Sequence, residues 1–247
     1  KDEFNPKFGV TWSPISGTTL RGAAFRVLKR PLIQDQTLEP TQVAGFNQYF
    51  DDADGTESWR YGAGIDQKIT SSLFGGVELS RRDLEVPYVS SGPVLRTLEE
   101  DWREQLARAY VYWTPQDWLA LSAEYQFERF DREGGFAGTE DFVEIKTHRI
   151  PLGINLFHRS GLLAGFRATY VDQKGEYGNP LSGFRPGSDQ FFVLDAVLGY
   201  RLPKRFGLIT LEARNLLDEG FNFQDTDPSN PVIYPERLIL LRLTLQF

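Results

Sequence analysis

The sequence predicts an all-β fold: an antiparallel transmembrane β-barrel, with residues 1–247 forming one partial barrel domain. Three observations predict it. Apolar and polar residues alternate with a period of two in one segment after another, so each segment has one apolar and one polar face. Most segments reach about 10–13 residues, the length that a tilted strand needs to cross a bilayer. Short and long connections alternate between them, as in bacterial outer-membrane barrels.

The alternation is clearest at the C-terminus. From Ile239 to Phe247 every odd position is apolar, whereas Arg242, Thr244 and Gln246 occupy even positions. One face of this strand therefore meets an apolar medium and the other a polar one.

The same rule predicts about 11–12 strands, of which eleven can be placed. They lie near 6–13, 19–30, 57–69, 73–84, 103–114, 117–130, 142–157, 161–173, 189–202, 205–217 and 236–247. The apolar series that support them include Trp59-Tyr61-Ala63-Ile65, Leu119-Leu121-Ala123-Tyr125-Phe127, Ile150-Leu152-Ile154-Leu156, Ala164-Phe166-Ala168-Tyr170, Phe192-Leu194-Ala196-Leu198-Tyr200 and Ile209-Leu211-Ala213. The segment 19–30 alternates least, because Gly22-Ala-Ala24 gives little contrast between its faces.

The connections place the two ends of the predicted barrel. Tight turns follow the strands at one end. The longer connections are 31–56, 85–102, 131–141, 174–188 and 218–235. They are rich in Asp, Gly, Pro and Asn, which favour irregular loops. We expect the long loops to be extracellular and the C-terminus periplasmic. The two longest loops, 31–56 and 85–102, are the candidates for ligand capture.

The strand count predicts that part of the barrel is missing. The first and last strands run in the same direction, and bacterial single-chain barrels have even strand numbers. An open edge is not tolerated in lipid. The absence of Met indicates a processed product or a fragment. We therefore expect the C-terminal portion of a larger barrel.

Composition excludes several classes. No apolar run approaches the roughly 20 residues of a spanning helix, and without Cys a disulfide scaffold is excluded. A net charge of −7 argues against a nucleic-acid partner. Aromatic residues make up 14% of the chain, which a large β core or two interfacial aromatic girdles would explain. Rings beside the predicted short turns favour girdles: Trp12, Trp113, Trp118, Tyr200 and Phe206.

Motifs for covalent chemistry are absent from the sequence. His148 and His158 form no ligand pair, and we expect neither enzymatic activity nor a cofactor. Asp51, Asp52 and Asp54 are weak calcium candidates. The calcium-loop pattern would place Phe50 and Tyr61 at its first and last ligand positions, which favours an acidic surface loop.

Charged residues at the polar positions of the strands are predicted to face the lumen. They are Glu124, Glu128, Arg149, Arg167, Asp195, Arg201, Glu212, Arg214 and Arg242. Paired carboxylates could perform acid–base catalysis, but mixed charges in a barrel wall more often solvate the interior and contact a plug or a permeant.

Both ends of the chain resemble the barrels of TonB-dependent receptors. The residues concerned are Phe4-Asn-Pro-Lys-Phe-Gly-Val-Thr-Trp12 and Thr18-Thr-Leu-Arg-Gly-Ala-Ala-Phe25 at the start, and Asn215-Leu-Leu-Asp218, Phe221, Asn230-Pro231, Pro235-Glu-Arg237 and Phe247 at the end. The resemblance implies that Phe247 is the signal read by the barrel-assembly machinery. A plug domain, a TonB box and room for that family's 22 strands are not found in this sequence.

The expected function is solute uptake or reception through a polar lumen, in the outer membrane of a Gram-negative bacterium. The expected partners are outer-membrane lipid and lipopolysaccharide, the assembly machinery, and a missing set of N-terminal strands, a plug or a periplasmic partner. A barrel for polysaccharide or other export, a structural or adhesive barrel, and a soluble β-sandwich are the alternatives.

Overall fold

The computed structural model describes residues 4–29, 42–48, 52–89, 96–132, 141–179, 183–224 and 233–245. Strands account for nearly all of its regular structure. They are β1 (Lys7–Trp12), β2 (Thr18–Leu28), β3 (Gln42–Val43), β4 (Phe46–Asn47), β5 (Glu57–Lys68), β6 (Leu73–Val89), β7 (Thr97–Gln116), β8 (Leu119–Arg132), β9 (Asp141–Phe157), β10 (Leu162–Asn179), β11 (Gly183–Arg201), β12 (Gly207–Arg214) and β13 (Leu238–Leu245). A single turn of 3-10 helix, Pro203–Arg205, joins β11 to β12.

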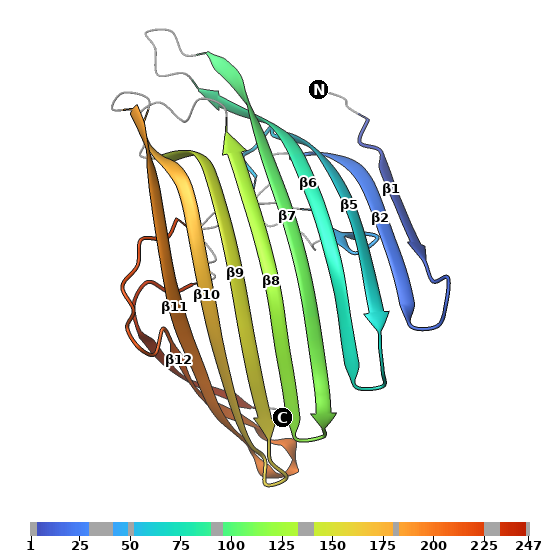
Figure 1. Cartoon of the computed structure of the whole chain (residues 1–247), viewed down its shortest axis with the longest axis vertical. Helices are drawn as coiled ribbons and strands as arrows, with labels where there is room; N and C mark the ends of the chain where they lie inside the picture. The colour runs from blue at the N-terminus through green and yellow to red at the C-terminus, as the bar shows by residue number, and fades with distance from the viewer. Residues whose placement is uncertain are drawn as a thin grey trace.

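Eleven of these strands form one antiparallel sheet, in the order β1-β2-β5-β6-β7-β8-β9-β10-β11-β12-β13. The eleven strands expected from the sequence are thereby confirmed. Each strand pairs with its neighbour in the chain, so the sheet is a meander (Figure 1). Within the described residues β1 and β13 do not pair with each other, and the sheet is open.

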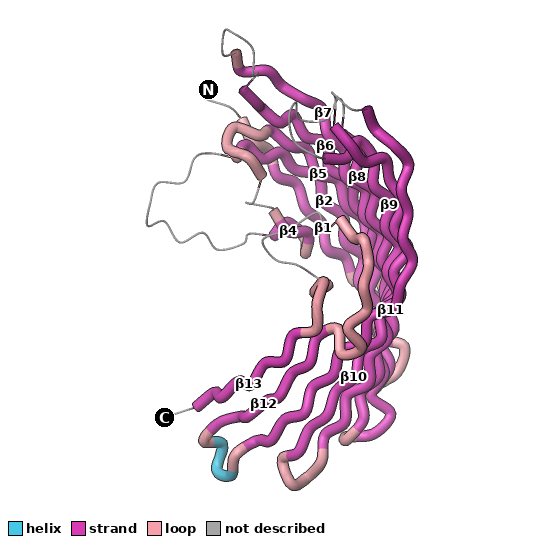
Figure 2. The backbone as a smooth tube through the Cα atoms, turned by 90° about the vertical axis from the view of Figure 1, so that its left-hand side faces the viewer, coloured by secondary structure: helices cyan, strands magenta, loops and turns pink. Residues whose placement is uncertain are grey.

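The sheet curves strongly and has one concave and one convex face (Figure 2). The small β3–β4 hairpin lies in the hollow and identifies the concave face by its contacts. Arg60 donates a hydrogen bond to the carbonyl of Asn47 in this hairpin. Because side chains alternate along a strand, the neighbouring Trp59 and Tyr61 lie on the convex face. The register carries this assignment across the whole sheet.

Three of the predicted long loops differ from expectation. The expected loop 85–102 is mostly strand, since β6 runs to Val89 and β7 begins at Thr97. Strands β10 and β11 likewise pair through most of 174–188. Both segments extend the sheet beyond its apolar band, where polar residues face outward, and such strands read as loops from composition alone. Within 31–56, residues 42–48 turn into the hollow.

Candidate functional site

The convex face carries an apolar band that crosses all eleven strands. Its members are exposed: Leu241 is 75% accessible, and Trp12 is 61% accessible beside its short turn. On β11 the band runs from Phe192 to Tyr200. That is about 26 Å along the strand, and roughly 20 Å along the axis of a barrel with strands tilted by about 40°. A continuous exposed apolar surface of this kind marks an interaction with a membrane or a partner.

The convex face changes from apolar to polar at one level of the sheet. From β6 to β11, the last apolar residues are Leu79, Ala107, Phe127, Ile150, Tyr170 and Phe192. The next convex residues toward the long hairpins are Arg81, Gln105, Arg129, His148, Asp172 and Gln190. The change falls in a single register row, apart from a step of two residues between β8 and β9. The convex face is therefore apolar on one side of this level and polar on the other.

The concave face is polar and charged below the same level, opposite the apolar band. Beyond that level it carries an apolar cluster of Phe130, Phe142 and Ile145, against which Trp102 and Tyr177 pack. Buried polar side chains such as Arg82 and Thr147 lie there as well. Along the apolar band, the two faces of the sheet therefore differ in polarity.

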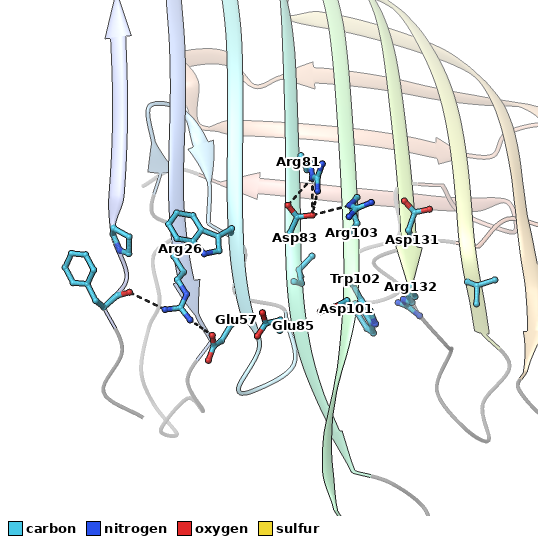
Figure 3. A pocket seen from close by; sticks show the side chains of 15 residues that line it. Arg26, Glu57, Arg81, Asp83, Glu85, Asp101, Trp102, Arg103, Asp131 and Arg132 are labelled. Atoms are coloured by element: carbon cyan, nitrogen blue, oxygen red, sulfur yellow. Dashed lines mark hydrogen bonds and ion pairs between the residues drawn. The ribbon is translucent and has the colours of Figure 1, made fainter.

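A groove lies on the convex face just beyond the apolar band, lined by aromatic and charged side chains (Figure 3). Asp83 accepts hydrogen bonds from Arg81 at 2.7 Å and from Arg103 at 3.2 Å. Partial burial raises the pKa of Asp83, but these two hydrogen bonds outweigh it and leave the pKa below its usual range. Arg26 pairs with Glu57 at the far side of the groove. These alternating charges suit a hydrated surface.

Opposite the band, the concave face carries paired charges near its centre. Arg21 contacts Asp66 at 2.7 Å and Glu78 at 2.9 Å. On the neighbouring strands Arg108 binds both carboxylate oxygens of Glu124, at 2.9 and 3.0 Å. Such bidentate pairs are geometrically specific. They place fixed charges on a wall that solvent or a solute can reach.

All nine residues predicted to face the lumen lie at concave positions of the register. The structure brings some of them together: Arg214 pairs with Glu212 at 3.3 Å, and Asp195 lies 3.8 Å from Arg214. Arg242 lies 3.7 Å from Glu212. They form a ladder of charges rather than a carboxylate dyad.

The β3–β4 hairpin was not predicted. Contacts with β1, β2 and β5 anchor it on the concave face. Phe46 is 1% exposed and lies over Gly62, with the Arg21 guanidinium 5.3 Å from its ring centre. Lys7 donates a hydrogen bond to Gln48 at 2.5 Å. The absence of a side chain at Gly62 makes room for the ring, so a glycine on a polar face was the signal available in the sequence.

We expect Gly62→Ala to release the hairpin. A Cβ at position 62 would lie 2.5 Å from two atoms of the Phe46 ring, which must then move. The burial of the Phe46 ring stabilises the anchored hairpin by about 2–3 kcal/mol. Release of the hairpin loses this free energy. Limited proteolysis with chymotrypsin should cut at Phe46 faster in the variant. Gly22→Ala is the matched control, since its Cβ meets only ordinary contacts of 3.4 Å or more on the convex face. Equal cleavage of both variants would contradict the anchoring role.

A second inward segment follows β12 and covers the concave face of β10 and β11. Ile233 joins a buried cluster with Val171, Phe191 and Val193, against which Phe221 and Phe223 pack. The ring of Phe221 stacks on Phe191 with centroids 4.2 Å apart. The described parts of 218–235, expected as an extracellular loop, therefore line the hollow. Phe221 is one of the residues that carry the resemblance to TonB-dependent receptor barrels. Its contact with Phe191 shows that it anchors this segment.

Asn215 holds this segment in place. It is fully buried and has a positive φ of 45°. Its Nδ2 donates to the carbonyl of Glu219 at 2.9 Å and to that of Tyr234 at 3.3 Å, while its Oδ1 accepts from the Glu219 amide at 2.9 Å. Its own amide donates to Asp195 at 3.0 Å. Asparagine tolerates the left-handed conformation better than most residues, and its side chain binds backbone groups both at Glu219 and at Tyr234.

We expect Asn215→Gly to lower the free energy of unfolding by about 2–3 kcal/mol, because buried amide and carbonyl groups lose their partners. Glycine keeps the positive φ, so the loss reports the side chain alone. Asn215→Ala should cost roughly 1 kcal/mol more because of the backbone conformation. Urea unfolding followed by circular dichroism in detergent micelles measures both. A glycine variant as stable as the parent would show that the backbone, not the side chain, matters here.

The structure also places the remaining candidates. Asp52 contacts Arg82 at 2.5 Å, Asp54 is exposed, and Asp51 lies outside the described residues, as does Phe247. Groups of three or more His, Asp or Glu side chains arranged for a metal ion do not occur in the described part of the chain. His148 and His158 lie on different strands or turns and contact Tyr125 and Ser160, respectively. The described residues contain no helix long and apolar enough to span a membrane.

Comparison with known proteins adds no assignment. No protein-family model matches this chain, and no curated protein matches it significantly. The site is therefore defined by its own geometry: an apolar convex band, a charged concave face opposite it, and two inward segments that cover part of that concave face.

Proposed function

We propose that this chain forms part of the wall of an outer-membrane β-barrel that takes up or receives a solute through a polar lumen. The opposite polarity of the two faces along the apolar band, and the change of the convex face from apolar to charged beyond it, support this most directly. An apolar convex band suits lipid, the charged convex surface beyond it suits water and lipid headgroups, and the charged concave face suits a hydrated lumen. The work of such a protein is passage or reception, without covalent chemistry.

The odd number of strands in the sheet indicates how the proposed barrel closes. Strands β1 and β13 are the first and last of eleven antiparallel strands and run in the same direction. An antiparallel closure therefore needs an odd number of additional strands. A second copy related by an axis along the barrel would bring strand edges together in parallel. We propose that additional strands of a TonB-dependent-receptor-like barrel close the sheet, as the resemblance at both ends of the sequence implies.

The inward segments favour reception over a wide open pore. The β3–β4 hairpin and the segment containing Ile233 occupy the hollow from opposite ends of the sheet (Figure 2). A lumen narrowed in this way admits solutes selectively. Transport assays with the complete barrel measure whether the solute is imported or exported.

Flotation with lipid vesicles tests membrane insertion. The chain, refolded from urea into phosphatidylcholine vesicles, should rise with the lipid in a sucrose gradient. It should stay bound after a carbonate wash and migrate differently on gels before and after heating. A chain that stays at the bottom of the gradient as a monodisperse, strand-rich protein would support the soluble β-sandwich and overturn the proposal.

A further inference from the structure

On the concave face, Arg149 and Arg167 are left without a partner by the charge ladder around them. Arg149 lies on β9 and Arg167 on β10, both opposite the apolar band. Within the described residues neither makes an ion pair or a hydrogen bond. An arginine is always charged and presents five donors, so a wall that leaves two of them unmatched has donors available for something else.

The carboxylates nearby are already engaged. Glu124 is held by Arg108 through two hydrogen bonds and accepts a third from Gln126 at 3.0 Å. Asp195, the register partner of Arg167, accepts from the Asn215 amide at 3.0 Å and lies 3.8 Å from Arg214. The carboxylates beside Arg149 and Arg167 are therefore held by other partners, and the donors of these two arginines stay open to a solute.

Both arginines line one small polar recess of about 130 Å³. This volume holds about four water molecules at ~30 Å³ each. A carboxylate or phosphate group fits into such a volume, whereas the rest of a larger solute stays outside it. Hydroxyl and amide groups also line it, from Ser122, Gln126 and Thr169. Ile233 and Tyr234 of the second inward segment form one of its walls.

The spacing suits a group held between the two side chains. The register places Arg149 opposite Val171, four residues from Arg167 along the sheet. That is about 13 Å between their backbones, and two long side chains can reach a small group from both sides. Guanidinium groups bind planar carboxylates and phosphates through paired hydrogen bonds, and the hydroxyls supply further donors.

We infer that Arg149 and Arg167 form a binding site for the oxyanion group, carboxylate or phosphate, of a small solute that enters the lumen. This inference rests on the proposed function and names the chemical class of its solute. The anchored wall of Ile233 and Tyr234 keeps the site narrow. Glu124 and Asp195 also line the recess, but Arg214 joins Arg149 and Arg167 there, so three cations face two carboxylates.

Isothermal titration of the full chain in detergent micelles tests the site. Citrate and inorganic phosphate serve as probes, and glucose as the uncharged control. The parent should bind at least one anion and not glucose, and the difference between citrate and phosphate tells which oxyanion the site prefers. Arg149→Gln with Arg167→Gln should weaken binding by at least about tenfold, the effect of losing charge-assisted hydrogen bonds. The matched control Arg103→Gln, on the convex face, should bind as the parent does.

A measurement on the unmodified chain covers the case in which the double variant does not fold. Phenylglyoxal modifies accessible arginines, and the sites are mapped by mass spectrometry. The bound anion should slow modification of Arg149 and Arg167 severalfold and leave Arg103 unchanged. Equal modification with and without anion, or equal binding by the Arg103 and double variants, would overturn the site.

Flotation distinguishes this outcome from failure of the proposed function. A chain that floats with vesicles yet binds neither anion overturns the oxyanion site and leaves the barrel proposal standing. A chain that binds anion but does not float overturns the barrel proposal.

Discussion

Leu241→Arg should abolish insertion of the chain into lipid vesicles, whereas Leu240→Arg should leave insertion intact. The two leucines are adjacent on β13 and alike in chemistry, but they occupy opposite faces. Leu241 is 75% exposed on the convex band, where an arginine near the middle of a bilayer costs about 2–4 kcal/mol. Leu240 is on the concave face opposite Glu212, a carboxylate that an introduced arginine can contact.

Vesicle flotation and heat-dependent gel migration measure both variants. The matched pair separates the medium on each face from the general cost of placing an arginine on β13. If Leu240→Arg were the more damaging change, the concave face would be the apolar-contact side, and the assignment of the lumen would be wrong. Equal loss in both variants would show that the effect does not depend on the face, and would contradict the assignment of the convex face to lipid.

Arg82→Met should destabilise the folded chain by about 3–5 kcal/mol near neutral pH, because it removes the counter-ion of the buried Glu104 carboxylate. Arg82 is 5% exposed and contacts Glu104 at 2.8 Å and Asp52 at 2.5 Å. This network lies on the concave side of the sheet, beyond the apolar band. Arg82→Met with Glu104→Leu should recover much of the loss, since an apolar pair can replace a buried ion pair.

The effect should depend on pH. Burial raises the pKa of Glu104 above its ordinary value, and the charge of Arg82 only partly offsets that. A raised pKa in the folded state means that stability from this group is present at low pH and is lost as pH rises through the folded value. Without Arg82 that loss grows, so the deficit of Arg82→Met should be smallest in acid and largest near neutral pH. Urea unfolding between pH 4 and about 8 measures it. A deficit that does not change with pH would place the cause in packing rather than in the unpaired carboxylate.

The strands could be predicted from the sequence because most of them obey one simple rule: apolar and polar residues alternate. Residues 121–128 and 241–245 obey it without exception, and the structure places strands there. The rule fails beyond the apolar band, where the pattern changes. At Glu85 and Asp101 charged residues face outward on regular strands, and composition alone assigns such residues to a loop.

The concave positions of the nine charged residues followed from the same alternation. Their partners could not be predicted, because an ion pair such as Arg108–Glu124 depends on register between strands, which the pattern of one strand does not contain. The positions of the two inward segments could not be predicted from the sequence either. Phe46 and Ile233 are isolated apolar residues within polar stretches, and their anchoring depends on a glycine and a buried asparagine far away in the sequence.

Fluorescence quenching by brominated lipids tests the central claim, that the convex band contacts lipid while the concave face does not. Two single-tryptophan variants of the inserted chain suffice, Leu241→Trp and Leu240→Trp, each with the five native tryptophans replaced by phenylalanine. The two positions are adjacent on β13 at one level of the apolar band, Leu241 on the convex face and Leu240 on the concave face opposite Glu212. Lipid brominated along its acyl chains should quench Leu241→Trp strongly and Leu240→Trp little. Equal quenching of the two, or stronger quenching of Leu240→Trp, would contradict the account.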